Sequence, residues 1–269
     1  MNSKQKVLYI SQEVTPYLPE THLGHLCQYI PHRVQEEGFE VRTFMPKYGC
    51  INERRNQLHE VIRLSGLNIP VDDNDHPLII KVATLQSSRM QVYFIDNDDY
   101  FRHHGVSDLE IRETPEENDE RLIFFMRGVM ETAKKLRWEP ALIHCSGWIS
   151  ALAPLYLKKS YSEDPTIGRA KVVFSIFNDV FEGTLNPRFQ EKLRMDGFSE
   201  EEIATLGAGP VDWVALNKLA VDYADGLVIA SEGVPADLVE YAKASGKPVL
   251  ESWSDEVEGA PMVEFYNSL

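Results

Sequence analysis

Lys6-Val-Leu-Tyr-Ile-Ser11 opens the stretch that decides the fold, and a turn-rich loop and a helical pattern follow it. This first run is apolar and rich in β-branched and aromatic residues, so it predicts a buried strand. Apolar residues then recur at helical spacing from Leu23 to Gly38, where the glycine predicts the helix end. A second strand is predicted at Glu40–Met45. Strand, helix and strand in this order predict a βαβ unit with parallel strands.

The same alternation continues along the chain, apart from one region between residues 58 and 96 that has extended runs without helical periodicity. Further strands are predicted at 61–64, 67–71, 78–85, 90–95, 141–145, 171–176, 227–230 and 248–251, and further helices at 118–137, 151–159, 187–195, 199–206, 211–223 and 234–244. Residues 102–117 predict an exposed loop or a short helix. The fold class is therefore α/β: a single Rossmann-like, doubly wound, mostly parallel sheet with an inserted antiparallel hairpin region.

Two units are predicted along the chain. Residues 1–250 form the Rossmann-like domain, and residues 251–269 form an acidic and apolar tail without Lys or Arg. Because the tail is too apolar for a purely disordered segment, we expect it to pack on the domain or on a partner.

Composition limits the partners of this protein. Its 27 Lys and Arg against 42 Asp and Glu give a net charge of −15, which disfavours nucleic acid and anionic membrane surfaces as partners. Cys27, Cys50 and Cys145 have no metal-like spacing and predict reduced, buried thiols. With no predicted signal sequence or membrane-spanning run, we expect a cytoplasmic protein.

The loop after the first strand occupies the place where an α/β sheet usually holds a ligand's phosphates. A phosphate cradle favours glycines and a lysine, yet Gly24 is the only glycine here, and no Lys or Arg lies between Gln12 and Pro31. A carboxylate at Glu20 would repel a phosphate, although backbone N–H groups could still bind one.

Residues at the ends of two later strands are the best candidates for a site, because carboxyl ends of parallel strands open onto one crevice. His144 could hydrogen-bond a sugar hydroxyl, or its ring could be satisfied by the backbone. Trp148 could stack on a sugar or pack in the core, and Asn178 could bind a ligand or cap the next segment. We therefore predict Gly24, His144, Trp148 and Asn178 as substrate-binding residues, with His144 the best catalytic candidate.

Other groups of polar residues give weaker indications. Asp179 and Glu182 could form paired carboxylates for acid–base chemistry or a solvated loop. His22, His25, Cys27 and His32 surround the first helix, but a metal site would need a further convergent ligand. The sequence therefore predicts no metal and no cofactor, and it has no Walker motif, nucleophile elbow or dinucleotide fingerprint.

Taken in order, these segments resemble the N-terminal domain of bacterial glycogen and starch synthases, which transfer glucose from ADP-glucose to an α-1,4-glucan. The segments that carry the resemblance are 6–17, 23–31, 93–96 with 100–102, 124–125, 138–148, 151–157, 173–178, Gly183, 223–225 and 230–231. The resemblance implies two Rossmann domains in the enzymes, of which this chain matches the first. It implies that the second glycosyltransferase domain is absent here and that the chain ends near the hinge.

The departures from the family pattern fall on its chemistry. The family's phosphate-binding Lys and Gly-Gly pair are replaced at Pro19, Thr21 and His22. Its His-x-His-Asp-Trp-His motif keeps His144 and Trp148, whereas Ser146, Gly147 and Ile149 replace the second His, the Asp and the last His. Of the family's later His-Asn pair, only the Asn remains, in Phe177-Asn178.

Two functions follow from the resemblance. The first is a pseudoenzyme of α-glucan metabolism, non-catalytic alone, that binds a sugar or glucan or has a regulatory role. The second is half of a glucosyltransferase that a separate chain with a donor-binding domain completes. We also expect the crevice to be partly occluded by residues 16–22 or by the tail.

Overall fold

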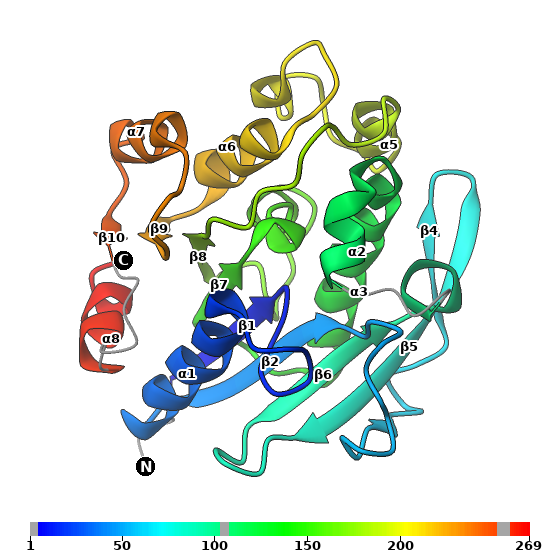
Figure 1. Cartoon of the computed structure of the whole chain (residues 1–269), viewed down its shortest axis with the longest axis vertical. Coiled ribbons are helices and arrows are strands. Elements are labelled where there is room, and N and C mark those ends of the chain that lie inside the picture. Colours follow the sequence, from blue (N-terminus) through cyan, green and yellow to red (C-terminus); the bar gives the residue numbers. More distant parts are fainter. Residues whose placement is uncertain (1–4, 103–107, 252–258) are drawn as a thin grey trace.

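The computed structural model describes residues 5–102, 108–251 and 259–269 (Figure 1). The strands are β1 Lys6–Ser11, β2 Glu40–Pro46, β3 His59–Glu60, β4 Leu67–Val71, β5 Asn74–Thr84, β6 Gln91–Asp96, β7 Leu142–Ser146, β8 Lys171–Ile176, β9 Gly226–Ile229 and β10 Val249–Glu251. The α-helices are α1 His22–Glu36, α2 Asp108–Glu113, α3 Asn118–Leu136, α4 Ala153–Lys158, α5 Phe189–Met195, α6 Trp213–Tyr223, α7 Ala236–Ala244 and α8 Gly259–Asn267. Single turns of other helix types are η1 Asp98–Arg102, η3 Pro115–Glu117, η4 Trp148–Ser150 and η5 Ala204–Leu206.

The strands form a sheet in the order β10-β9-β8-β7-β1-β2-β6-β5-β3, and β4 pairs with β5. Pairing is parallel from β10 to β6. The strands of this part are mostly buried, except for the edge strand β10. The predicted fold class is therefore confirmed. The strand order reverses its direction beside β1, so the carboxyl ends of β1 and β7 flank the switch point where open α/β sheets bind ligands.

The predicted antiparallel insertion is present as β3, β4 and β5, which extend the sheet beyond β6 (Figure 1). One strand of this region was predicted wrongly. Residues 61–64 form a turn in which the Leu64 N–H donates to the Val61 carbonyl at 2.9 Å, and the short strand lies at His59–Glu60 instead. The predicted helix at 199–206 is also wrong, because only η5 at its end is helical.

Helices cover both faces of the sheet. α1 packs against α8, while α3, α4 and α6 form a second layer in which α4 contacts both neighbours. α1 ends near the predicted glycine, since Gly38 adopts a left-handed φ of +98° just beyond the helix. Asn118 is the first residue of α3, and its buried side chain donates to the Ile111 carbonyl.

The tail contributes directly to the core. Tyr266 and Phe265 of α8 are buried, and the side chain of Leu269 lies so close to Gly226 of β9 that an added Cβ would meet it at 2.8 Å. Of the three cysteines, Cys27 and Cys145 are buried as expected, but Cys50 is exposed. Among the described residues, no helix is both long and apolar enough to cross a membrane.

Candidate functional site

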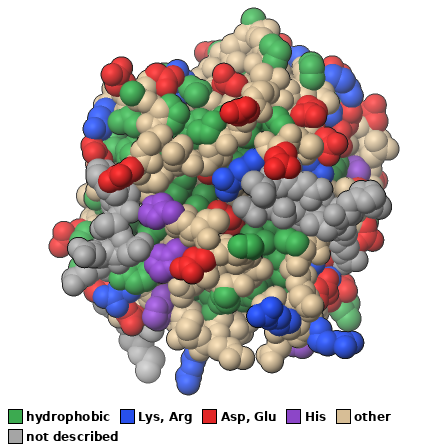
Figure 2. Space-filling view, viewed as in Figure 1, with side chains coloured by type: hydrophobic (Ala, Val, Ile, Leu, Met, Phe, Trp, Pro, Cys, Tyr) green, Lys and Arg blue, Asp and Glu red, His purple; other side chains and the backbone are tan. Residues whose placement is uncertain are grey.

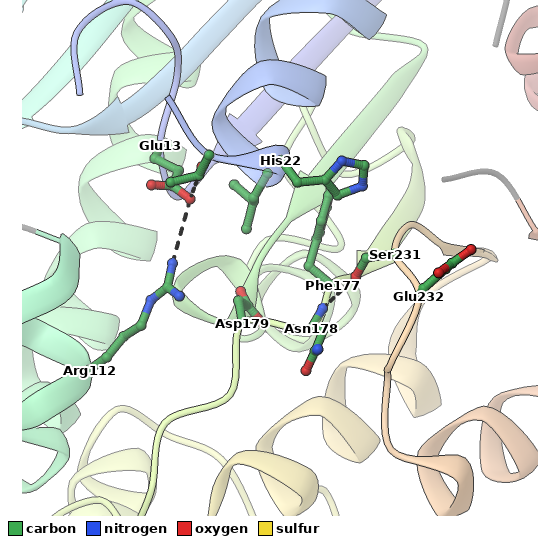
Figure 3. Close-up of a pocket in the computed structure, with 10 residues that line it drawn as sticks. Glu13, His22, Arg112, Phe177, Asn178, Asp179, Ser231 and Glu232 are labelled. Atoms are coloured by element: carbon green, nitrogen blue, oxygen red, sulfur yellow. Dashed lines mark hydrogen bonds and ion pairs between the residues drawn. The ribbon is translucent and has the colours of Figure 1, made fainter. Parts of the chain in front are cut away.

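A pocket of about 480 Å³ opens at the carboxyl ends of β1, β8 and β9 (Figure 3). Its walls come from the start of α1, from α2 and from the segments after β8 and β9. The lining residues are Glu13, Thr21, His22, Leu23, Arg112, Phe177, Asn178, Asp179, Ser231 and Glu232. The pocket therefore lies on the side of the sheet where the topology predicts a ligand.

Thr21 begins α1 and joins the helix to the pocket wall. Its backbone is extended, and its Oγ1 accepts the Gly24 N–H at 2.9 Å, as an N-cap does. The same hydroxyl donates to Oε1 of Glu13 at 2.8 Å. The cap is tightly packed, because a Cβ at Gly24 would lie 3.1 Å from Thr21 Oγ1 and 3.2 Å from Thr15 Oγ1.

Glu13 also forms an ion pair across the pocket. Nη2 of Arg112 on α2 lies 3.5 Å from Glu13 Oε1 (Figure 3). The Glu13 side chain is only 1% exposed, whereas that of Arg112 is 24% exposed. Arg112 is the only Lys or Arg among the described residues that line this pocket.

The opposite wall is held by contacts between loops from three strands. The Asn178 N–H donates to Ser231 Oγ at 2.6 Å, and His22 Nε2 lies 3.0 Å from the Ala230 carbonyl. The rings of His22 and Phe177 meet edge to face with centroids 6.3 Å apart. These contacts leave Asn178 exposed at the pocket wall, with its side-chain amide available to a ligand.

Asp179 lines the floor of the pocket but faces the core. One carboxylate oxygen accepts the Trp148 N–H at 3.0 Å, and the other accepts Nε1–H of Trp213 at 3.2 Å. Burial raises the pKa of Asp179 to about 6, although these hydrogen bonds and the charge of Arg112 lower it. Asp179 is therefore a buried carboxylate that fixes a turn, not a group in a solvated loop.

The turn that Asp179 fixes requires a glycine. Gly147 has a φ of +83°, and an added Cβ would lie 2.9 Å from Gln12 Oε1 and 3.0 Å from Asp179 Oδ2. Gln12 Oε1 also accepts the Ile149 N–H at 3.3 Å. The loops after β1, β7 and β8 are thus locked together beneath the pocket.

The structure places His144 in the core and not at the pocket wall. Its side chain is 1% exposed, with Nδ1 2.6 Å from the Tyr266 hydroxyl and Nε2 2.6 Å from Ser175 Oγ. Burial lowers the pKa of His144 to about 3, so the ring is neutral at pH 7. The assignment of His144 to substrate binding or catalysis stays a prediction that this geometry does not support.

Trp148 and Gly24 also lie behind the pocket. Trp148 is fully buried and packs edge to face on Phe181, with ring centroids 4.9 Å apart. Gly24 lies in the first turn of α1, where its N–H completes the cap. Of the four predicted substrate-binding residues, only Asn178 lines the pocket.

The histidines around the first helix do not converge. His22 contacts Ala230, whereas His25 stacks on Tyr29 and lies 4.0 Å from a carboxylate oxygen of Glu20. Figure 2 shows histidine side chains along the face that carries α1, beside an acidic side chain. Within the described residues, no three His, Cys, Asp or Glu side chains lie together in a way that could hold a metal ion.

Several pocket residues escaped the sequence reasoning. Arg112 falls in the segment predicted as an exposed loop or short helix, far in sequence from the first loop. Ser231 and Glu232 could have been found only because they are polar residues that directly follow the strand predicted at 227–230. Pairing of Glu13 with Arg112 depends on the approach of α2, which no local pattern reveals.

The pocket therefore combines three carboxylates with one guanidinium that is already paired. Amide, hydroxyl and imidazole groups of Asn178, Ser231 and His22 supply neutral hydrogen-bonding partners at the wall, whereas Phe177 and Leu23 supply apolar surface. Such a mixture suits an uncharged polyhydroxy ligand better than a diphosphate.

Comparison with known proteins identifies similar chains. A family model described as the starch synthase catalytic domain matches residues 6–248. A glycogen synthase of Chlorobaculum parvum is 39% identical over 188 residues, which cover 70% of this chain and 38% of that protein. A glycogen synthase of Pelodictyon phaeoclathratiforme is 35% identical over 235 residues, which cover 87% and 47%. The chain thus spans less than half the length of these curated relatives.

Solved structures show the same fold. The catalytic domain of starch synthase IV from Arabidopsis thaliana, bound to ADP and acarbose, superposes with a TM-score of 0.75 at 18% identity, over 94% of this chain and 52% of that one. At this identity the likeness concerns the fold alone.

Proposed function

This chain belongs to the starch synthase catalytic-domain family, and from this premise we propose that it binds an uncharged sugar or α-glucan end in the pocket without transferring glucose by itself. The pairing of Arg112 with the buried carboxylate of Glu13 carries the proposal. A pocket whose only Lys or Arg among the described lining residues is already engaged has little to offer a diphosphate.

The first loop supports the same function. Transfer from a nucleotide sugar depends on groups that stabilise the charge of the diphosphate. Losing one such preorganised group commonly lowers the rate by about 10²–10³. Pro19, Thr21 and His22 occupy the positions at which the resemblance implies a Lys and two Gly. A sugar without phosphates needs none of these, because hydroxyl and amide partners are sufficient to hold it.

Calorimetric titrations with maltotriose, acarbose and ADP test the proposal, and the last two are the molecules bound to the Arabidopsis thaliana domain. We expect saturable binding of maltotriose or acarbose and none of ADP. Asn178→Ala should weaken sugar binding, whereas Asn68→Ala on β4, an exposed asparagine away from the pocket, should not. Tight ADP binding with no sugar binding would defeat the proposal.

The second candidate function is half of a glucosyltransferase that a separate chain completes. The similarity to glycogen synthases, of which this chain covers 38% and 47%, favours it. Transfer from ADP-glucose to a maltooligosaccharide should then appear only when a protein carrying a donor-binding domain is added. Absence of transfer with every such protein tested, together with sugar binding by the chain alone, supports the first function.

A further inference from the structure

A second cavity of about 340 Å³ shares no lining residue with the pocket described above. Its walls come from three segments that are distant in sequence: the first loop, the chain between β2 and β3, and the end of β5 with the turn that follows it. Its described lining residues include one arginine, Arg55, and no Asp or Glu. The cavity therefore differs in charge from the first pocket, which is lined by three carboxylates.

Tyr17 of the first loop brings a polar group without a partner to this cavity. The residue is 8% exposed, and its ring packs edge to face on Phe94 of β6 with centroids 4.9 Å apart. Its hydroxyl forms no hydrogen bond with any described residue, yet it is not sealed inside the core. Because the ring is packed, the hydroxyl is the part of Tyr17 that faces the cavity. Burial raises the pKa of Tyr17 to about 12, so the hydroxyl is protonated at pH 7 and can donate to a ligand.

Arg55 supplies a positive charge that nothing in the described part of the chain neutralises. Its side chain is exposed, and its guanidinium forms no hydrogen bond or ion pair with a described residue, although the protein carries a net charge of −15. The backbone beside it is held by Asn52, whose Oδ1 accepts the Arg55 N–H at 2.9 Å and whose carbonyl accepts the Asn56 N–H at 3.1 Å. A guanidinium held in this way suits a phosphate group, which it can bind through two parallel N–H groups.

Neutral polar side chains form the rest of the rim. Four of them are exposed and have no hydrogen-bond partner among the described residues: Gln57, Thr84, Gln86 and Ser87. An amide or a hydroxyl group can both donate and accept, as a sugar hydroxyl does. The rim therefore suits the polyhydroxy part of a ligand.

We infer that this cavity is a second ligand site, which binds the phosphate monoester of a sugar: Arg55 binds the phosphate, and the Tyr17 hydroxyl with the amides and hydroxyls of the rim binds the sugar. The inference goes beyond the proposed function, which concerns an uncharged ligand in the other pocket. The two sites differ in the ligand that they select, because only this one presents an arginine without a carboxylate beside it among the described lining residues.

Calorimetric titration of the full chain with glucose 6-phosphate tests the inference. Wild type should bind it saturably, and more tightly than it binds glucose or inorganic phosphate. Arg55→Gln should weaken binding at least about tenfold, because a charge-assisted hydrogen bond is lost, and Arg55→Lys should weaken it less. Tyr17→Phe keeps the packed ring and should weaken binding about three- to tenfold. Arg169→Gln, at an exposed arginine that does not line the cavity, is the matched control and should bind as wild type does.

Three results would each overturn the inference: no saturable binding by wild type, inorganic phosphate bound as tightly as glucose 6-phosphate, or an equal loss in Arg55→Gln and Arg169→Gln. A titration repeated in the presence of maltotriose distinguishes the two sites. We expect the affinity for glucose 6-phosphate to stay unchanged, and competition between the two sugars would place both in one pocket and overturn the inference. If maltotriose itself does not bind, the proposed function fails, while saturable binding of glucose 6-phosphate that depends on Arg55 would still support the second site.

Discussion

The hydroxyl of Tyr266 lies 2.6 Å from Nδ1 of His144 and 2.9 Å from the hydroxyl of Tyr9. This relationship ties α8, the last helix of the chain, to β1 and β7 at the centre of the sheet. The same contact occupies Nδ1 of His144, which the sequence predicted as the best catalytic candidate.

Removing the Tyr266 hydroxyl should destabilise the protein. Tyr266→Phe leaves buried polar atoms of His144 and Tyr9 without this partner, and each such loss costs about 1–3 kcal/mol. The free energy of unfolding from urea titrations measures the effect. Tyr29→Phe is the control, because Tyr29 on α1 is only partly buried; equal stability of the two variants would contradict the role of Tyr266.

Asp179 should make the free energy of unfolding depend on pH. Burial raises the pKa of this carboxyl from 3.8 to about 6, so between these values the folded protein holds a proton that the unfolded chain releases. This contribution to the free energy of unfolding is therefore full below pH 3.8 and is lost as the pH rises through about 6.

The variant Asp179→Asn lacks that titration. We expect the stability of wild type relative to Asp179→Asn to fall across this window, by at most about 1.4 kcal/mol per pH unit. Urea unfolding of both proteins at several values between pH 4 and 7 measures the difference. Parallel pH dependences would show that Asp179 keeps an ordinary pKa.

A side chain at Gly147 should be poorly tolerated. Its φ of +83° is a glycine conformation, and an added Cβ would meet Gln12 and Asp179 within 3.0 Å. Gly147→Ala should cost about 1–3 kcal/mol from the backbone alone and should also weaken maltotriose binding by moving the pocket floor. Gly209→Ala, where an added Cβ meets nothing within 4 Å, is the control; equal unfolding midpoints would refute the constraint.

Lys192 should be important for joining α5 to α3. Its Nζ lies 2.5 Å from Asp119 Oδ2 and 2.6 Å from Glu120 Oε1, and its side chain is 4% exposed. Lys192→Ala leaves the buried carboxylate of Asp119 without this partner and should lower the free energy of unfolding by about 3–5 kcal/mol. Lys218→Ala, which breaks a looser pair with Asp237 at 3.8 Å, should cost less than about 1 kcal/mol. Thermal unfolding that does not distinguish the two would contradict this.

The parallel core could be predicted because its strands are apolar on both faces, and runs such as Val172–Ile176 can only be buried. Residues 61–64 look equally extended, but their hydrogen bonds close a turn, which depends on contacts with β5. Local pattern does not contain those contacts.

The site was harder to predict for a similar reason. Asn178 could be found because it closely follows a parallel strand, β8, whose carboxyl end opens onto the same side of the sheet as the switch point. His144 lies instead in the middle of β7, and its side chain points into the core, where Tyr266 of the distant tail meets it. Arg112 reaches the pocket only because α2 folds over the first loop, and such long-range approaches leave no periodic signal in the sequence.

Backbone amide NMR shifts during titration with maltotriose and with ADP-glucose test the central claim most directly, because they report both binding and its location. We expect maltotriose to shift the amides of Thr21, His22, Asn178 and Ser231 saturably, and ADP-glucose to leave them unchanged. Saturable shifts of these amides with ADP-glucose, or maltotriose shifts confined to residues away from the pocket, would contradict the account.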